Sequence, residues 1–306
     1  MTLIKNELFQ VCLDGNLKVV KELIEKGADI NATDDIGSTA LTFAIKSGNM
    51  NIIRYLIEKG ADINAKDHAG YTILMTGGET GNLEIVQYLV EHGAEVNSKT
   101  KYGSPVIMTS YSLFNNINIV KYLVANGADI NAKKNDGWSI LMAMASVCEL
   151  DIVKYIIEQG ADVNARTDAG YTVLMAAASC GNLDVVKFLI EEMTINVNSK
   201  NNAGYTALAY GAESGGLAVV KYLVARGANL NMTSKDGLSV LHIAALNGNL
   251  DIVKFLLYND LDINKKDMFG NTPLALVKRR GDVEIMEYLI QHGAEVNVKD
   301  SIGAIL

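Results

Sequence analysis

The sequence predicts an all-α repeat solenoid, in which similar short units stack on one another in chain order. Nine variants of the motif Gly-Ala-Asp-Ile-Asn recur about 33 residues apart, a spacing typical of helical repeats. Single glycines follow the same period, which indicates stacked supersecondary units rather than a closed globule. Full motif copies stand at 27–31, 60–64 and 127–131, with a Val variant at 160–164. The glycines are Gly37, Gly70, Gly103, Gly137, Gly170, Gly204, Gly237, Gly270 and Gly303.

Composition narrows the class of function. A chain of 306 residues suggests two globular domains, but the repeat predicts one elongated domain over residues 1–306. The net charge of −8 argues against sequence-independent binding to nucleic acid or to an anionic membrane. The three cysteines have irregular spacing, which indicates a reducing compartment without a disulfide framework. With no signal peptide and no long apolar run, the expected location is cytoplasmic.

Each repeat is predicted to contain a turn and two short helices, as residues 34–66 illustrate. Gly37 can adopt positive φ in the turn, and the hydroxyl of Thr39 can cap the helix that follows. Gly60 is expected to end the second helix. One such repeat buries its apolar stripes only against its neighbours, so stability is expected to depend on contacts between adjacent repeats. The helices are expected over residues 40–47 and about 51–59, with a break at Gly48-Asn49.

This pattern resembles the ankyrin repeat over essentially the whole chain. The resemblance is carried by Gly270-Asn271-Thr272-Pro273-Leu274, by Leu241-His242-Ile243-Ala244-Ala245 and by the nine Asn-ending motifs. It implies an L-shaped repeat of a β-hairpin and an antiparallel helix pair, and a stack whose concave face binds other proteins. Only Pro273 and His242 supply the family's proline and histidine. The histidine-centred hydrogen-bond network of the family is therefore expected to be mostly absent.

The resemblance divides the chain into three parts. Residues 1–33 keep the helix pair without the hairpin and are predicted to be an N-terminal capping pair. Residues 34–299 are predicted to form eight full repeats. Residues 300–306 begin another hairpin and stop after its turn. A chain cut from a longer protein is the favoured interpretation, and a hairpin that closes the last full repeat is the alternative.

Several repeats depart from the common pattern. Phe114-Asn115-Asn116 and Cys148-Glu149 replace the inter-helix Gly-Asn, and an insertion at 191–195 removes a capping glycine. Drift among redundant repeats is the favoured interpretation, with a loop redirected towards a binding site as the alternative. Gly77-Gly78 and Gly211 stand inside first helices, where each costs about 1 kcal/mol relative to Ala. They predict local softness or close helix packing.

A row of aromatic residues in the turns of the middle repeats is the predicted partner-binding surface. Exposed Tyr and Trp are the side chains most enriched at binding hot spots. Packing of these rings on neighbouring hairpins is an alternative role that is compatible with binding. The small or acidic flanking residues suit a protruding peptide or helix with a basic rim. The predicted residues are Tyr71, Tyr102, Trp138, Tyr171 and Tyr205, flanked by Leu113, Val147, Glu79 and Glu213.

The sequence predicts no catalytic residue, metal site or cofactor. The four histidines lie in different repeats, and Cys12, Cys148 and Cys180 lack the spacing of metal ligands. The expected function is that of a monomeric, non-catalytic scaffold that binds a partner protein through its concave groove. A targeting or regulatory domain of a larger enzyme and an inhibitor of a partner enzyme are the alternatives. By analogy with bacterial ankyrin arrays, secretion into a host cytosol is an alternative location.

Overall fold

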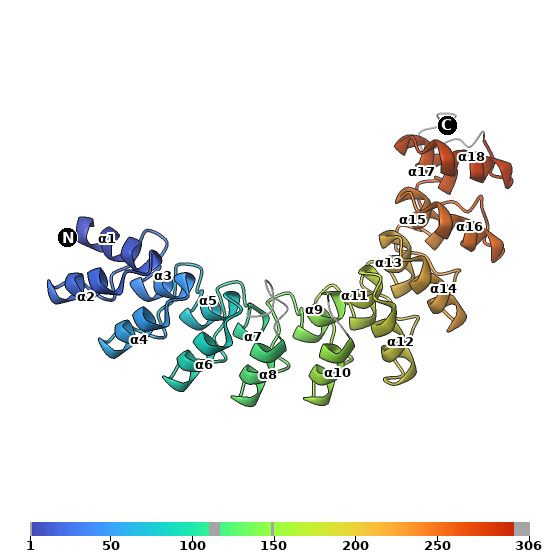
Figure 1. The fold of residues 1–306 in the computed structure, drawn as a ribbon. Helices are drawn as coiled ribbons and strands as arrows, with labels where there is room; N and C mark the ends of the chain where they lie inside the picture. Colours follow the sequence, from blue (N-terminus) through green and yellow to red (C-terminus); the bar gives the residue numbers. More distant parts are fainter. Residues whose placement is uncertain (1, 110–116, 148–149, 297–306) are drawn as a thin grey trace. The chain divides into compact units, whose positions relative to one another are not determined.

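The computed structural model describes residues 2–109, 117–147 and 150–296, and these contain eighteen α-helices. The chain forms two compact units, an N-terminal unit of residues 1–135 and a C-terminal unit of residues 136–306. Within each unit the helices occur in antiparallel pairs that follow one another in chain order (Figure 1). The predicted helical repeat stack is therefore confirmed.

In the N-terminal unit, each first helix packs on the first helix of the next pair, from α1 to α7. The apolar core lies between successive pairs and includes the fully buried Leu41, Ile53 and Leu89. The first helices are α1 (Thr2–Leu13), α3 (Ala40–Ser47), α5 (Ile73–Glu79) and α7 (Val106–Thr109). The second helices are α2 (Leu17–Glu25), α4 (Met50–Glu58), α6 (Leu83–Glu91) and α8 (Ile117–Ala125).

The C-terminal unit repeats this packing, with first helices in contact from α9 to α17 and second helices from α10 to α18. The residues between them, such as Leu174, Val186 and Leu241, are almost wholly inaccessible to solvent. Its first helices are α9 (Ile140–Val147), α11 (Val173–Ser179), α13 (Ala207–Ser214), α15 (Val240–Leu246) and α17 (Pro273–Arg280). Its second helices are α10 (Leu150–Glu158), α12 (Leu183–Glu191), α14 (Leu217–Ala225), α16 (Leu250–Tyr258) and α18 (Val283–Gln291).

The predicted capping residues lie at the helix ends where the sequence predicted them. The Thr39 hydroxyl accepts a hydrogen bond from the Thr42 N–H, so that Thr39 caps α3 over its predicted bounds. The second helix of this repeat begins one residue earlier than expected, because the side chain of Asn49 caps it. Pro273 occupies the first turn of α17, where a missing N–H costs nothing. The Phe114 to Asn116 and Cys148-Glu149 breaks lie outside the described residues.

The turns before α3, α5, α7, α11 and α15 form short hairpins, each held by an isolated backbone bridge, such as those that join Thr33 to Thr39 and Arg166 to Thr172. Adjacent hairpins are connected by a backbone hydrogen bond; the His68 N–H donates to the Ile36 carbonyl at 2.8 Å. Gly37 is required at this contact. Its φ is +91°, and a Cβ atom there would lie 2.8 Å from the His68 nitrogen.

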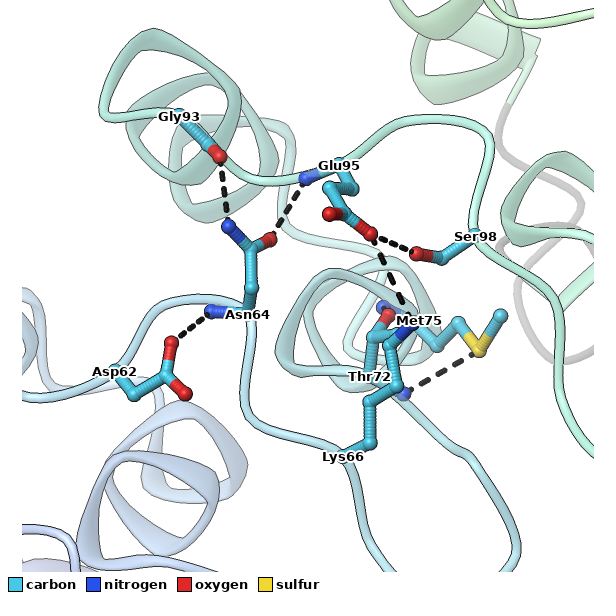
Figure 2. Close-up of polar contacts among 8 residues, drawn as sticks. All are labelled: Asp62, Asn64, Lys66, Thr72, Met75, Gly93, Glu95 and Ser98. Atoms are coloured by element: carbon cyan, nitrogen blue, oxygen red, sulfur yellow. Dashed lines mark hydrogen bonds and ion pairs between the residues drawn. The ribbon is translucent and has the colours of Figure 1, made fainter.

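The asparagine that ends the repeated motif joins neighbouring repeats, as Figure 2 shows for Asn64. Its side-chain amide donates to the Gly93 carbonyl at 3.0 Å, and its oxygen accepts the Glu95 N–H at 2.9 Å. We call this pair of hydrogen bonds the asparagine clamp. It satisfies backbone groups in the loop after the second helix of the next repeat. Equivalent clamps are formed by Asn31, Asn97, Asn198 and Asn264.

Two repeats of the C-terminal unit lack the clamp. Within the part of the chain that the structure describes, the side chains of Asn164 and Asn231 form no hydrogen bond. The loops that they would reach contain Thr194 (φ 52°) and Asp260 (φ 56°), the positive-φ residues other than glycine among those described. Thr194 lies in the predicted insertion and takes the left-handed conformation without a glycine, at a cost of about 1–2 kcal/mol.

Gly77 and Gly211 differ in the space around them. A Cβ atom on Gly77 would lie 2.9 Å from Leu89 Cδ1, so close helix packing explains this glycine. A Cβ atom on Gly211 would meet Val219 Cγ1 at 3.4 Å, which is an ordinary contact. Gly211→Ala is therefore expected to stabilise the protein by about 0.5–1 kcal/mol, through the lower backbone entropy of Ala.

Gly77→Ala is expected to yield no gain, because the fully buried Leu89 must shift to admit the methyl group. Urea unfolding followed by circular dichroism measures both changes. Equal stabilisation by the two substitutions would contradict the packing explanation for Gly77.

Candidate functional site

Four aromatic side chains of the C-terminal unit contact one another and form the candidate site. Trp138 stacks on Tyr171 with ring centroids 5.3 Å apart, and Tyr171 meets Tyr210 edge-to-face at 4.9 Å. Tyr205 lies against Tyr210 at 5.6 Å. We call these four residues the aromatic cluster. All four are half-buried, so each contributes both to the packing and to the solvent-facing surface.

Consecutive repeats supply this cluster because three of its members follow hairpin glycines and the fourth lies on α13. Hydrogen bonds fix the rings: the Tyr171 hydroxyl donates to Ser179 Oγ at 3.1 Å, and Asn201 Nδ2 donates to the Tyr210 hydroxyl at 2.9 Å. The Tyr205 N–H donates to Asn201 Oδ1 at 2.9 Å. These hydrogen bonds and the ring contacts restrain the cluster, and such restraint lowers the entropic cost of binding a partner.

The electrostatic environment of the cluster is negative. Burial raises the pKa of Tyr171, Tyr205 and Tyr210, the last to about 12, and the charge of Glu213 raises all three further. The phenols are therefore neutral at physiological pH. Glu213 is exposed near the end of α13, and its carboxylate has no ion pair or hydrogen bond among the described residues. The Glu213 carboxylate is thus a negative charge that acts on all three tyrosines and is available to a partner.

Tyr210 is not among the predicted site residues, which lie beside hairpin glycines or near the ends of first helices. It lies inside α13 at the repeat position that Ala176 occupies in the preceding repeat. Other repeats carry Phe43, Ile243 and Leu276 at the equivalent position, so the size of Tyr210 alone gave no signal. Its place at the centre of the cluster depends on packing between repeats, which periodicity alone does not reveal.

In the N-terminal unit, Tyr71 and Glu79 come together at a small cleft. The Tyr71 hydroxyl donates a very short hydrogen bond to the Glu79 carboxylate. Burial, this hydrogen bond and the Glu79 charge together raise the pKa of Tyr71. The cleft has a volume of about 210 Å³, and its lining also includes Lys46, Asp67 and Thr76. The lining of the cleft therefore combines positive and negative charges with hydroxyl groups.

The remaining predicted residues do not join either group. Tyr102 is 75% exposed at a hairpin tip of the N-terminal unit, and Val147 is 64% exposed on α9 of the C-terminal unit. Leu113 lies outside the described residues. Among the described residues of the N-terminal unit, Tyr71 and Tyr102 form no ring contact. The aromatic row predicted from the sequence is therefore divided between two units, and its ring contacts lie in the C-terminal one.

Other reactive side chains are dispersed. Over residues 2–109, 117–147 and 150–296, no group of His, Cys, Asp or Glu could hold a metal ion. Cys12 is buried, which raises its thiol pKa to about 12, and Cys180 is exposed. His92 and His292 each donate a hydrogen bond from Nδ1 to a Tyr carbonyl of the preceding helix turn. Among the described helices, none combines the length and the apolar character needed to cross a membrane.

A family model described as ankyrin repeats (3 copies) matches the chain in four stretches, residues 8–100, 106–201, 141–234 and 208–300. The chain belongs to the ankyrin repeat family. A comparison with curated proteins found no match. Ankyrin repeats are in general protein–protein interaction modules and are typically non-catalytic, so the general class of function is protein binding.

The histidine that is typical of the first helix of ankyrin repeats is present in this chain at His242. His242 links the start of α15 to the next hairpin: its Nδ1 lies 2.7 Å from Ser239 Oγ and its Nε2 lies 3.1 Å from the Asn271 carbonyl. At the same position Met75 offers only its sulfur, which accepts the Thr72 N–H at 3.4 Å (Figure 2).

Proposed function

We propose that this ankyrin repeat chain is a non-catalytic scaffold that binds a partner protein on its concave face. The observation that supports this most strongly is the aromatic cluster, in which four rings fix one another while part of each stays accessible. Preorganised Tyr and Trp side chains provide large contact areas at low entropic cost and are typical of hot spots. Binding through such a surface requires no cofactor and no chemical step.

The cleft of the N-terminal unit supports a second point of contact with the same kind of partner. Its hydroxyl and charged groups can pair with a polar side chain, whereas the aromatic cluster suits a flat or apolar one. The net charge of −8 favours a protein partner over nucleic acid. Each contact can be tested separately because the two lie in different units.

Replacing Trp138, Tyr171 and Tyr205 together by Ala is expected to weaken partner binding at least about tenfold, since hot-spot residues carry most of the binding energy. The partner is first recovered by cross-linking to the wild-type chain, and its affinity for both proteins is then measured by titration calorimetry.

Tyr258→Ala is the matched control, because this ring on α16 is 88% exposed and lies outside the cluster. It is expected to leave the affinity unchanged. Unchanged affinity of the triple variant, with its helicity retained in circular dichroism, would exclude the cluster as the binding site.

A further inference from the structure

The surroundings of the aromatic cluster favour a positively charged partner group. Glu213 and Asp236 are both exposed, and both raise the pKa of Tyr205 through their charge. Within the described residues neither carboxylate forms an ion pair. Glu213 also lies next to the last residue of α13, where the helix dipole adds negative potential.

Four cations of the C-terminal unit have interactions with groups outside the cluster. Arg166 donates to the Lys200 carbonyl, and Lys200 donates to the Thr233 carbonyl. Arg226 pairs with Glu191, and Lys221 lies over the Phe255 ring on the second helices. Among the described residues, none of these four cations nor Lys235 forms an ion pair with Glu213 or Asp236, so both carboxylates can accept a cation from outside.

The shape of the cluster selects among cations. Trp138 and Tyr171 stack nearly parallel, with an interplanar angle of 27°, and Trp138 remains half-exposed. A planar guanidinium can stack on exposed rings of this kind while its N–H groups donate hydrogen bonds to a carboxylate. A lysine ammonium is compact and strongly hydrated, so it gains less from the same arrangement.

We propose that the aromatic cluster binds an arginine side chain of the partner, with the guanidinium on the exposed rings and its charge neutralised by Glu213. This inference rests on the proposed function, because it names the chemistry that the same surface recognises. It extends that function by predicting that the partner presents an accessible basic segment. It assigns Glu213 a role in recognition that packing does not require.

The test uses the full chain and three synthetic peptides of Gly and Ser that carry one central arginine, citrulline or lysine. Citrulline keeps the planar shape of arginine without its charge. Trp138 is the single tryptophan of the chain, so its fluorescence and indole N–H resonance report binding at the cluster. The arginine peptide is expected to bind at least about threefold more tightly than either of the others.

Two isosteric variants separate recognition from folding. Glu213→Gln is expected to weaken binding of the arginine peptide about threefold or more, since it removes the charge and keeps the side-chain shape. Glu158→Gln, at the exposed end of α10, makes the same change of charge away from the cluster and is expected to have no effect.

Equal binding of the arginine and citrulline peptides, equal binding by wild type and Glu213→Gln, or no binding of the arginine peptide up to about 10 mM would overturn the inference. These results leave the proposed function intact if the triple aromatic variant still loses the natural partner. If that variant still binds the natural partner, the result would instead contradict the proposed function, regardless of the affinities measured for the three peptides.

Discussion

His242→Met is expected to abolish the dependence of stability on pH that this histidine creates in the C-terminal unit. Burial lowers the pKa of His242 below its ordinary value of 6.5, although the Asn271 carbonyl and Asp267 partly offset this effect. Protonation would place a hydrogen on Nδ1, which lies 3.2 Å from the Ser239 N–H and accepts from it. The neutral ring is therefore the form that fits the fold.

The sign follows from proton binding. Below pH 6.5 the unfolded chain binds a proton at His242 that the folded chain resists, so stability falls as the pH is lowered. The contribution of neutral His242 to the free energy of unfolding is complete above pH 6.5. It declines by at most about 1.4 kcal/mol per pH unit between this value and the pKa of His242 in the folded chain. Lys265 is the cation near the ring, and its charge lowers the pKa further.

At pH 7 His242→Met is expected to cost about 1–2 kcal/mol, because the hydrogen bond to the Asn271 carbonyl is lost. Below pH 6.5 the wild type should lose stability faster, so that the two proteins converge. Urea unfolding between pH 5.5 and 7.5, followed by circular dichroism, measures both slopes. Parallel slopes in the two proteins would show that His242 does not titrate as the structure implies.

Asn64→Ala is expected to destabilise the N-terminal unit by about 1–3 kcal/mol. The substitution removes two hydrogen bonds, one to the Gly93 carbonyl and one from the Glu95 N–H, each worth about 0.5–1.5 kcal/mol. Because the clamp joins adjacent repeats, its loss also weakens the contact on which each repeat depends. The urea midpoint of unfolding measures the change.

Asn231→Ala is the matched control within the same chain. Asn231 occupies the same motif position, but its side chain has no hydrogen bond within the described residues. It is expected to change stability by less than about 0.5 kcal/mol, as ordinary surface substitutions do. Similar losses for the two variants would mean that the asparagine acts through the loop conformation rather than through the clamp.

Local signals explain why so much of the fold was predictable. The Thr39 cap, the Gly37 turn and the Pro273 helix start each depend on residues a few positions away, and each acts as expected. The periodic apolar stripe fixed which faces pack together. The N-terminal capping role of residues 1–33 and the count of full repeats stay predictions.

The site was less predictable because it depends on contacts between repeats. The turn residues Trp138, Tyr171 and Tyr205 could be selected by position, but Tyr210, which contacts two of them, could not. Similarly, the motif of Asn231 itself does not show that this side chain forms no clamp, although the loop that it would reach has Asp260 where the clamped loops have glycine. The assignment of the predicted site residues to partner binding remains a prediction. Substitutions in the aromatic cluster test it.

The absence of the clamp at Asn164 and Asn231 has a mechanical consequence. In a stack of repeats each repeat contacts only its neighbours, so the stack deforms most easily at the junctions where the contact between neighbours is weakest. Both weak joints belong to the C-terminal unit, on either side of the clamp that Asn198 forms. We therefore expect any bending of this unit to occur mainly at these two junctions, while the repeats themselves stay rigid.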